Sequence, residues 1–244
     1  METLHTALHD AHLDAGATMQ AYDGWDLPAH YGDLAGELAE AHARAVVVDL
    51  SHLGRFRISG DEALDLLEAV CTCDVARQED DTCRRTLLCG DDGRLIDLCV
   101  LARLDDHWML TCSPARCRTV ADHLGDHAAA RKVKVKDVTE NTTMLWICGP
   151  AGAQLLDPVL PEKVSPLPRG TARAGSYLIA KYVAMRNGMT TLWSLEVTLP
   201  KLRERYYYEN SKYGYCRGTE PVNYVQKIKI YYDILRRKGI EYQR

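Results

Sequence analysis

One stretch of sequence, residues 86–102, most constrains the fold because it has the pattern of a complete β-hairpin. Two apolar runs are joined by Asp91, Asp92 and Gly93, residue types that favour a tight turn. In the second run, alternate residues share one side of the strand, and both sides are apolar except at Asp97. We therefore expect a strand buried on both faces that carries one carboxylate into the interior.

A buried carboxylate at this position needs an explanation, because removing a charged group from water is costly unless it finds a partner. Asp97 is then either held by protein donors, such as the backbone amides of a nearby turn, or it faces a pocket. A buried carboxylate that only stabilises the fold and one that serves a functional site can have the same sequence pattern. The spacing of residues leaves both readings open.

The composition of the chain is that of an ordinary globular protein. It has 244 residues, of which 46% are hydrophobic and 26% charged, so it can bury a sizeable core. A formal net charge of −4 gives no indication of a nucleic-acid or membrane role, and no apolar run approaches membrane-spanning length. The N-terminus lacks the basic start and apolar stretch of a signal peptide.

The cysteines and histidines suggest no metal centre. There are nine cysteines, an odd number without a CxxC pair, which favours reduced thiols in the cytoplasm over disulfides or a structural zinc site. His5, His9 and His12 share one face of a helix predicted at the N-terminus. No acidic or thiolate partner stands at matching spacing, so we interpret them as a solvated face and predict no metal site.

The remaining pattern predicts short strands mixed with helices. Helices are expected over residues 33–44 and after Ser59, where Ser59 and Glu62 have the spacing of a capping box. Before Ser59, apolar residues alternate with Arg55 and Arg57, as in a half-buried strand. Without a regular βαβ rhythm, this mixture predicts an α+β fold.

The C-terminal segment differs from the rest of the chain. Residues 201–244 hold 11 Lys and Arg against 5 Asp and Glu, whereas the first 200 residues hold 19 against 29. The same segment contains 9 of the 13 tyrosines. We predict one domain over residues 1–200 and a divergent, basic, mostly helical segment over 201–244, with a helix at 222–238.

Six segments carry a family resemblance. In chain order they are YDGWDLPAHY, VVVDLSHLGRFRISG, TCDV, TLLCGDDGRLID, VKDVTENTTMLWICGP and RNGMTTLWSLEVTLP. Together they resemble the folate-binding part of the glycine cleavage T-protein, aminomethyltransferase, a fold also used by folate-dependent demethylases and YgfZ-type iron–sulfur assembly proteins. The resemblance implies interleaved α/β modules, with residues 45–135 as a middle module and mixed, mostly antiparallel sheets. The segment 201–244 is too short for the family's C-terminal barrel domain.

The resemblance also implies roles for individual residues. Asp97 matches the family's catalytic carboxylate, and Glu196 matches the glutamate that holds the pterin ring. A carboxylate can accept bonds from the ring's amino and N–H donors in a fork geometry. Leu53 and Leu88 are expected to pack against the cofactor.

Three of the matching positions depart from the family. The family usually has Met, Asn and Tyr where this chain has Leu53, Cys112 and Met189. Leu for Met keeps the volume, Cys for Asn removes an amide that could bind the pterin, and Met for Tyr removes an aromatic surface. These positions and Arg186 complete the expected cofactor-binding set.

The function implied is a one-carbon transferase, moving an aminomethyl or methyl group, with tetrahydrofolate as cofactor. The expected partners are folate, a one-carbon donor and a lipoyl carrier protein, without nucleic acid or membrane. Two alternatives stay open. One is a non-catalytic folate-binding module, related to the YgfZ-type proteins, and the other is a scaffold that has lost its ligand.

Overall fold

A computed structural model describes residues 3–158, 160, 163–177, 180–187 and 190–196; for 175–184 and 186–196 it describes the backbone alone. These residues belong to one compact unit, residues 1–196. The expected boundary at residue 200, the helix at 222–238, the lack of a barrel domain and the role of Met189 all fall outside the described residues.

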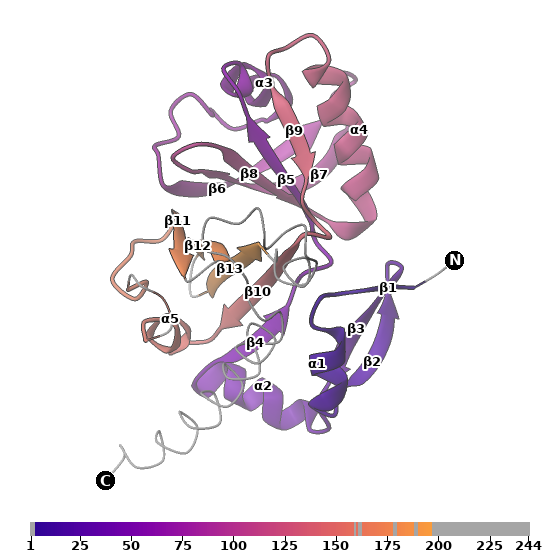
Figure 1. Cartoon of the computed structure of the whole chain (residues 1–244), viewed down its shortest axis with the longest axis vertical. Helices are drawn as coiled ribbons and strands as arrows, with labels where there is room; N and C mark the ends of the chain where they lie inside the picture. Colours follow the sequence, from indigo (N-terminus) through magenta and orange to yellow (C-terminus); the bar gives the residue numbers. More distant parts are fainter. Residues whose placement is uncertain (1–2, 159, 161–162, 178–179, 188–189, 197–244) are drawn as a thin grey trace, which may run out of the picture. The chain divides into compact units, whose positions relative to one another are not determined.

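In the described part of the chain, short helices separate runs of consecutive strands (Figure 1). The helical elements are α1 His9–Asp14, α2 Leu34–Ala43, α3 Ala63–Val70, the 3-10 turn η1 Pro114–Arg116, α4 Cys117–Ala128 and α5 Gly152–Leu156. The strands are β1 Leu4–His5, β2 Thr18–Tyr22, β3 Trp25–His30, β4 Val46–Asp49, β5 Gly54–Ser59, β6 Thr82–Cys89, β7 Leu95–Arg103, β8 Trp108–Cys112, β9 Lys134–Asp137, β10 Thr142–Cys148, β11 Thr171–Tyr177, β12 Ala180–Asn187 and β13 Thr190–Glu196.

Most strands join one large sheet in the order β4-β10-β13-β12-β11-β6-β7-β8-β5-β9. Its strand pairs are antiparallel, and β11 meets β6 through the single pair Thr171 and Thr82. A small sheet, β1-β3-β2, is built from residues 4–30 and contains one parallel pair, β1 with β3. This is the mixed, mostly antiparallel α+β arrangement that the sequence predicted.

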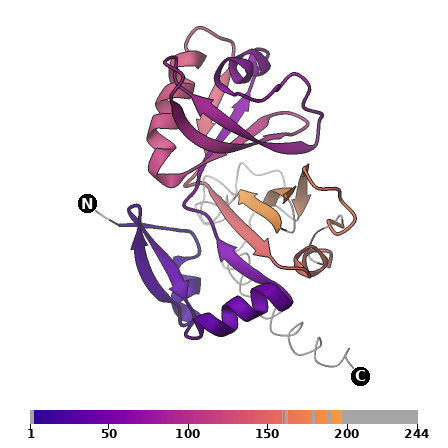
Figure 2. The same cartoon turned by 180° about the vertical axis from the view of Figure 1, so that it is seen from behind.

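The main core lies where α3 and α4 pack on the strands β5 to β9 (Figure 2). Four residues of α3 point inward as their spacing predicted: Ala63, Leu66, Leu67 and Val70. The predicted capping box is wrong, because Glu62 itself is the N-cap residue and makes no side-chain cap. Its carboxylate accepts a hydrogen bond from the backbone N of Lys132 instead, at 2.9 Å.

Two further predictions need correction. The N-terminal helix begins only at His9, because Leu4 and His5 pair with Trp25 and Asp26 as a strand. The β6–β7 hairpin forms as predicted, but its second strand is not buried on both faces at its start, where Leu98 is 53% exposed. Burial on both faces is confined to the second half of β7, where it continues beside β8.

Candidate functional site

Asp97 lies on β7 and pairs with Leu88 of β6. The register of the two strands shifts at the next position, between Leu88 and Cys89. Strand β8 pairs with β7 only from Val100 to Arg103, so no strand residue of β8 stands directly opposite Asp97. The chain turns there from Cys112 through Ser113 into η1. The carboxylate therefore meets a backbone that has just left the sheet and still has hydrogen-bond donors to offer.

Ser113 supplies both of the donors that the structure gives to Asp97. Its backbone N donates to Oδ2 at 2.6 Å and its hydroxyl donates to Oδ1 at 2.8 Å. Asp97 is only 8% exposed. The expectation that this carboxylate is tied to donors of a nearby turn is thus met, and an ionised carboxylate still has acceptor positions beyond these two.

Three of the predicted site residues lie close together in the structure: Asp97, Leu88 and Cys112. A fourth, Leu53, lies next to them. Leu88 is the cross-strand partner of Asp97, and Cys112 immediately precedes Ser113. Leu88 and Cys112 both belong to the main core, where Leu88 is completely buried. Leu53 stands one residue before Gly54, the partner of Cys112, and packs instead on the neighbouring core cluster around Met144.

Cys112 forms a hydrogen-bonded pair with Cys117, the first residue of α4. A Cβ on Gly54 would lie 2.5 Å from the Sγ of Cys112 and 2.8 Å from that of Cys117, so this position needs glycine to make room for both sulfurs. The hydrogen bond with Cys117 and burial raise the pKa of the Cys112 thiol. The same hydrogen bond lowers the pKa of Cys117, outweighing the opposite effect of burial.

Arg55 is a residue that the strand pattern misplaced. Instead of facing solvent on a half-buried strand, it is completely buried. Its guanidinium lies among backbone carbonyls: Nη1 donates to Leu53 O at 2.6 Å, and Nη2 donates to Ser51 O at 3.1 Å and to Thr142 O at 2.9 Å. Burial lowers its pKa to about 10, which still leaves it charged near neutrality.

Arg55 also contacts the strand that pairs with the end of β13, where Glu196 lies. Its Nε donates to the hydroxyl of Thr142 at 2.6 Å, and Thr142 is the register partner of Glu196. One sequence signal points to this contact, a cluster of threonines at 139, 142 and 143 whose hydroxyls can accept from an arginine.

Arg186 lies elsewhere on the same hairpin. Its backbone pairs with Thr191 on β13 and with Thr171 on β11, whereas Glu196 ends β13 beside Thr142. Arg186 therefore lies beside the start of β13, whereas Glu196 lies at its end. The role of Arg186 in cofactor binding stays a prediction.

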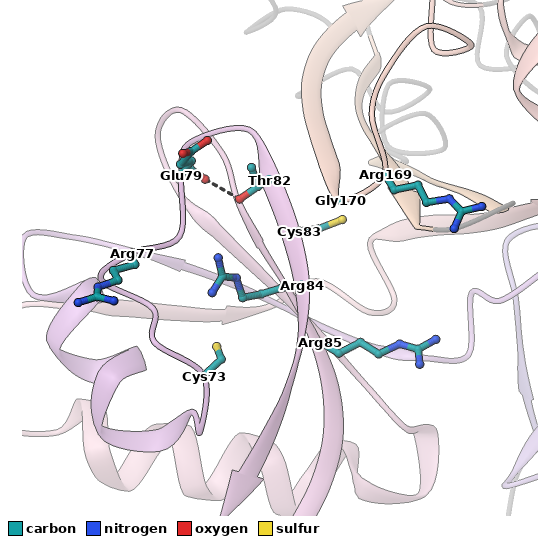
Figure 3. A pocket seen from close by; sticks show the side chains of 9 residues that line it. All are labelled: Cys73, Arg77, Glu79, Thr82, Cys83, Arg84, Arg85, Arg169 and Gly170. Atoms are coloured by element: carbon teal, nitrogen blue, oxygen red, sulfur yellow. Dashed lines mark hydrogen bonds between the residues drawn. The ribbon is translucent and has the colours of Figure 1, made fainter.

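A hollow of about 510 Å³ lies on the other half of β6, toward β11. Figure 3 shows its lining, in which Arg84 and Arg85 extend to opposite sides of the strand. Its lining residues are Cys73, Arg77, Glu79, Thr82, Cys83, Arg84, Arg85, Arg169 and Gly170. Four arginines against one glutamate make it positive, and none of the predicted site residues lines it.

Two general features accompany the site. The eight cysteines in the described part of the chain are all free thiols. Among the described residues, no helix combines the length and apolar character needed to cross a membrane.

Comparison with known proteins gives a consistent result. Residues 8–211 match the family described as the GCVT N-terminal domain. An aminomethyltransferase of Streptomyces coelicolor is 30% identical over 156 residues, which are 64% of this chain and 42% of the relative. One of Chlorobium phaeovibrioides is 27% identical over 198 residues, 80% of this chain and 54% of the relative.

A solved structure agrees with the observed fold. The glycine cleavage system aminomethyltransferase T of Bartonella henselae superposes with a TM-score of 0.70 at 22% identity, covering 79% of this chain and 53% of that one. At this identity the likeness concerns the fold. The chain spans about half the length of the relatives it matches.

Proposed function

Because the chain belongs to the family of the GCVT N-terminal domain, we propose that it is a tetrahydrofolate-dependent one-carbon transferase of the aminomethyltransferase type. The observation that carries this proposal is the buried carboxylate of Asp97, fixed from one side by Ser113. Family membership supports the general class of folate-dependent transferase. The specific reaction, the site residues and the partners are our inference.

Support for a folate at this place comes from Asp97 itself. Its carboxylate retains acceptor positions, so it can take a hydrogen bond from a ring nitrogen. The hydroxyl of Thr143 is buried and has no hydrogen-bond partner among the described residues. Thr143 follows Thr142, the register partner of Glu196, but adjacent residues of a strand face opposite sides of the sheet, so this hydroxyl does not support the pterin site.

When bound, tetrahydrofolate would supply the nitrogen that accepts the one-carbon group. Asp97 would orient that nitrogen and stabilise the positive charge that develops beside it, which a carboxylate does well at a site of low dielectric. Ser113 would hold the carboxylate in a single orientation. The rest of the rate enhancement would come from holding both substrates together in the reactive orientation.

The donor we propose is an aminomethyl group on the lipoyl arm of a carrier protein, which releases ammonia on transfer to the folate. The test is to titrate the purified chain with tetrahydrofolate by calorimetry and to measure folate-dependent ammonia from an aminomethyl-loaded carrier. We expect binding of one equivalent and ammonia release. The absence of heat with any reduced folate would contradict the proposal.

One observation favours a second candidate, a folate-binding module without catalysis. Cys112 stands where the family has an amide, and its thiol is engaged with Cys117 in the core. Folate binding without ammonia release would select this alternative.

A further inference from the structure

The small N-terminal sheet gathers three side chains that can bind metal, outside the site described above. They are His5 on β1, His9 at the start of α1 and Asp26 on β3. Each offers one ligand atom, and these atoms all lie within 4.8 Å of one another. The acidic partner that the sequence spacing did not provide is supplied by the fold.

The backbone fixes this arrangement. His5 is the direct register partner of Asp26 in the parallel β1–β3 pair, so both side chains start from adjacent positions on the sheet. The backbone N of His9 donates to Thr6 O at 3.1 Å, which turns the chain back over β3. His9 Nε2 then reaches Asp26 Oδ2 at 3.0 Å, and its ring stacks on that of His5 with centroids 3.8 Å apart.

We propose that His5, His9 and Asp26 bind one divalent transition-metal ion, with zinc as the ion that best suits the donors. Two imidazole nitrogens and one carboxylate oxygen are ligands that zinc accepts, and three protein ligands leave a coordination position for water. A bound ion would connect β1, α1 and β3.

The distances allow such an ion after a small adjustment. Zinc lies about 2 Å from each nitrogen or oxygen ligand, so two ligand atoms can be at most about 4 Å apart. His9 and Asp26 already satisfy this limit. The other ligand atoms lie within 4.8 Å, and the exposed ring of His5 can turn out of its stack with His9 to point a nitrogen at the ion.

A second carboxylate supports His9. Its other ring nitrogen, Nδ1, lies 3.5 Å from Asp10 Oδ1. Histidines that bind metal commonly donate their second N–H to a carboxylate, which orients the ring. Asp10 would therefore be a positioning residue for the site.

His12, the third histidine of the predicted helical face, does not take part. Its Nε2 lies 2.9 Å from Asp49 Oδ2 and its Nδ1 lies 2.6 Å from the hydroxyl of Tyr31. Both nitrogens are thus engaged on the side of α1 that faces the main sheet strand β4. The sequence placed His5, His9 and His12 on one helical face. In the proposed ligand set, Asp26 takes the place of His12.

The test titrates the full chain, free of any affinity tag, with zinc chloride by calorimetry. We expect one site, and we expect H5A, H9A and D26N each to weaken zinc binding at least roughly tenfold. D10N should weaken it less, by up to roughly tenfold, because Asp10 acts through His9. The control H42A removes an exposed histidine of α2 and should leave the affinity unchanged.

The cysteines are the competing zinc ligands, and cobalt(II) distinguishes them. A site of nitrogen and oxygen ligands gives visible d–d bands without the near-ultraviolet charge-transfer band of thiolate ligands. Zinc should also raise the melting temperature of the wild-type chain but not of H5A, in which the exposed ring can be removed without disturbing the fold. No zinc binding, affinity unchanged in H5A and H9A, or a thiolate band with cobalt would each overturn the proposal.

Discussion

Asp97 and Ser113 form a two-point contact in which one residue satisfies both carboxylate oxygens, through its backbone N at 2.6 Å and its hydroxyl at 2.8 Å. The contact forms because β8 ends at Cys112 and the chain leaves the sheet beside β7. A carboxylate held in this way keeps one orientation while it is buried. That property suits both a structural role and the positioning of a substrate nitrogen.

The Ser113 hydroxyl can be removed without losing its backbone donor. We expect S113A to lower the free energy of unfolding by about 1 kcal/mol, the usual worth of one such hydrogen bond. Under the proposed function it should also lower kcat roughly tenfold with little change in KM for tetrahydrofolate, because the carboxylate loses its fixed orientation. Steady-state kinetics beside the control S59A, on the far end of β5 from Gly54, would check this. An unchanged kcat would limit Ser113 to a structural role.

Arg55 should be essential for stability. Replacing it by methionine keeps an unbranched apolar stem in the core but removes the guanidinium that donates to the carbonyls of Leu53, Ser51 and Thr142. We expect R55M to lower the free energy of unfolding by about 3 kcal/mol or more.

The matched control is R57M on the same strand. Arg57 pairs with Asp106 at 3.0 Å on the surface, so its loss should cost within about 1 kcal/mol. Urea unfolding of both variants measures the difference. Equal effects would mean that the carbonyl contacts of Arg55 add nothing beyond those of a surface arginine.

Asp49 should make the free energy of unfolding depend on pH in the acidic range. Burial raises its pKa, but hydrogen bonds from His12, Ser51 and Thr6 outweigh this, so the folded pKa lies below the ordinary value of 3.8. A carboxyl whose pKa is lower when folded stabilises the fold above its unfolded pKa, and this contribution is lost as pH falls through the folded pKa.

The variant D49N tests this dependence. We expect it to be less stable than the wild type by about 2 kcal/mol near neutral pH, because asparagine has a single neutral acceptor oxygen and its NH2 group cannot accept the remaining hydrogen bonds. The difference should shrink once the pH falls below the ordinary value of 3.8. Urea unfolding over a pH series measures it, and a difference that stays constant into acid would be inconsistent with this role for Asp49.

Cys117 should be the more reactive thiol of its pair. The hydrogen bond from Cys112 lowers its pKa, whereas burial raises the pKa of Cys83 to about 11 and that of Cys71 to about 12. We expect iodoacetamide to modify Cys117 before Cys83 and Cys71, because the thiolate is the nucleophile. C112A should slow this labelling, while C83A should not. Peptide mass spectrometry over time gives the order, and earlier labelling of Cys83 would contradict it.

Local patterns predicted the elements that depend on neighbouring residues. The β6–β7 hairpin follows from its turn residues, and the inward face of α3 follows from its spacing of apolar residues. The family resemblance correctly gave the antiparallel α+β architecture. These features need little information from distant parts of the chain.

Several failures involve partners that are far away in sequence. Arg55 was assigned to a polar face, yet residues 139 and 142, more than 80 positions later, cover it with hydroxyl and carbonyl oxygens. Glu62 has the spacing of a capping box, but its carboxylate accepts a hydrogen bond from the backbone N of Lys132 instead. Asp26 completes the histidine cluster only because β1 pairs with β3.

The most direct measurement compares D97N with the wild type in folate-dependent ammonia release from an aminomethyl-loaded lipoyl carrier. Asparagine keeps the size of the side chain and can still accept from Ser113, but it lacks the negative charge. We predict that kcat falls roughly 100-fold or more while the dissociation constant for tetrahydrofolate stays within about threefold. A variant that turns over as fast as the wild type would contradict the catalytic role of Asp97.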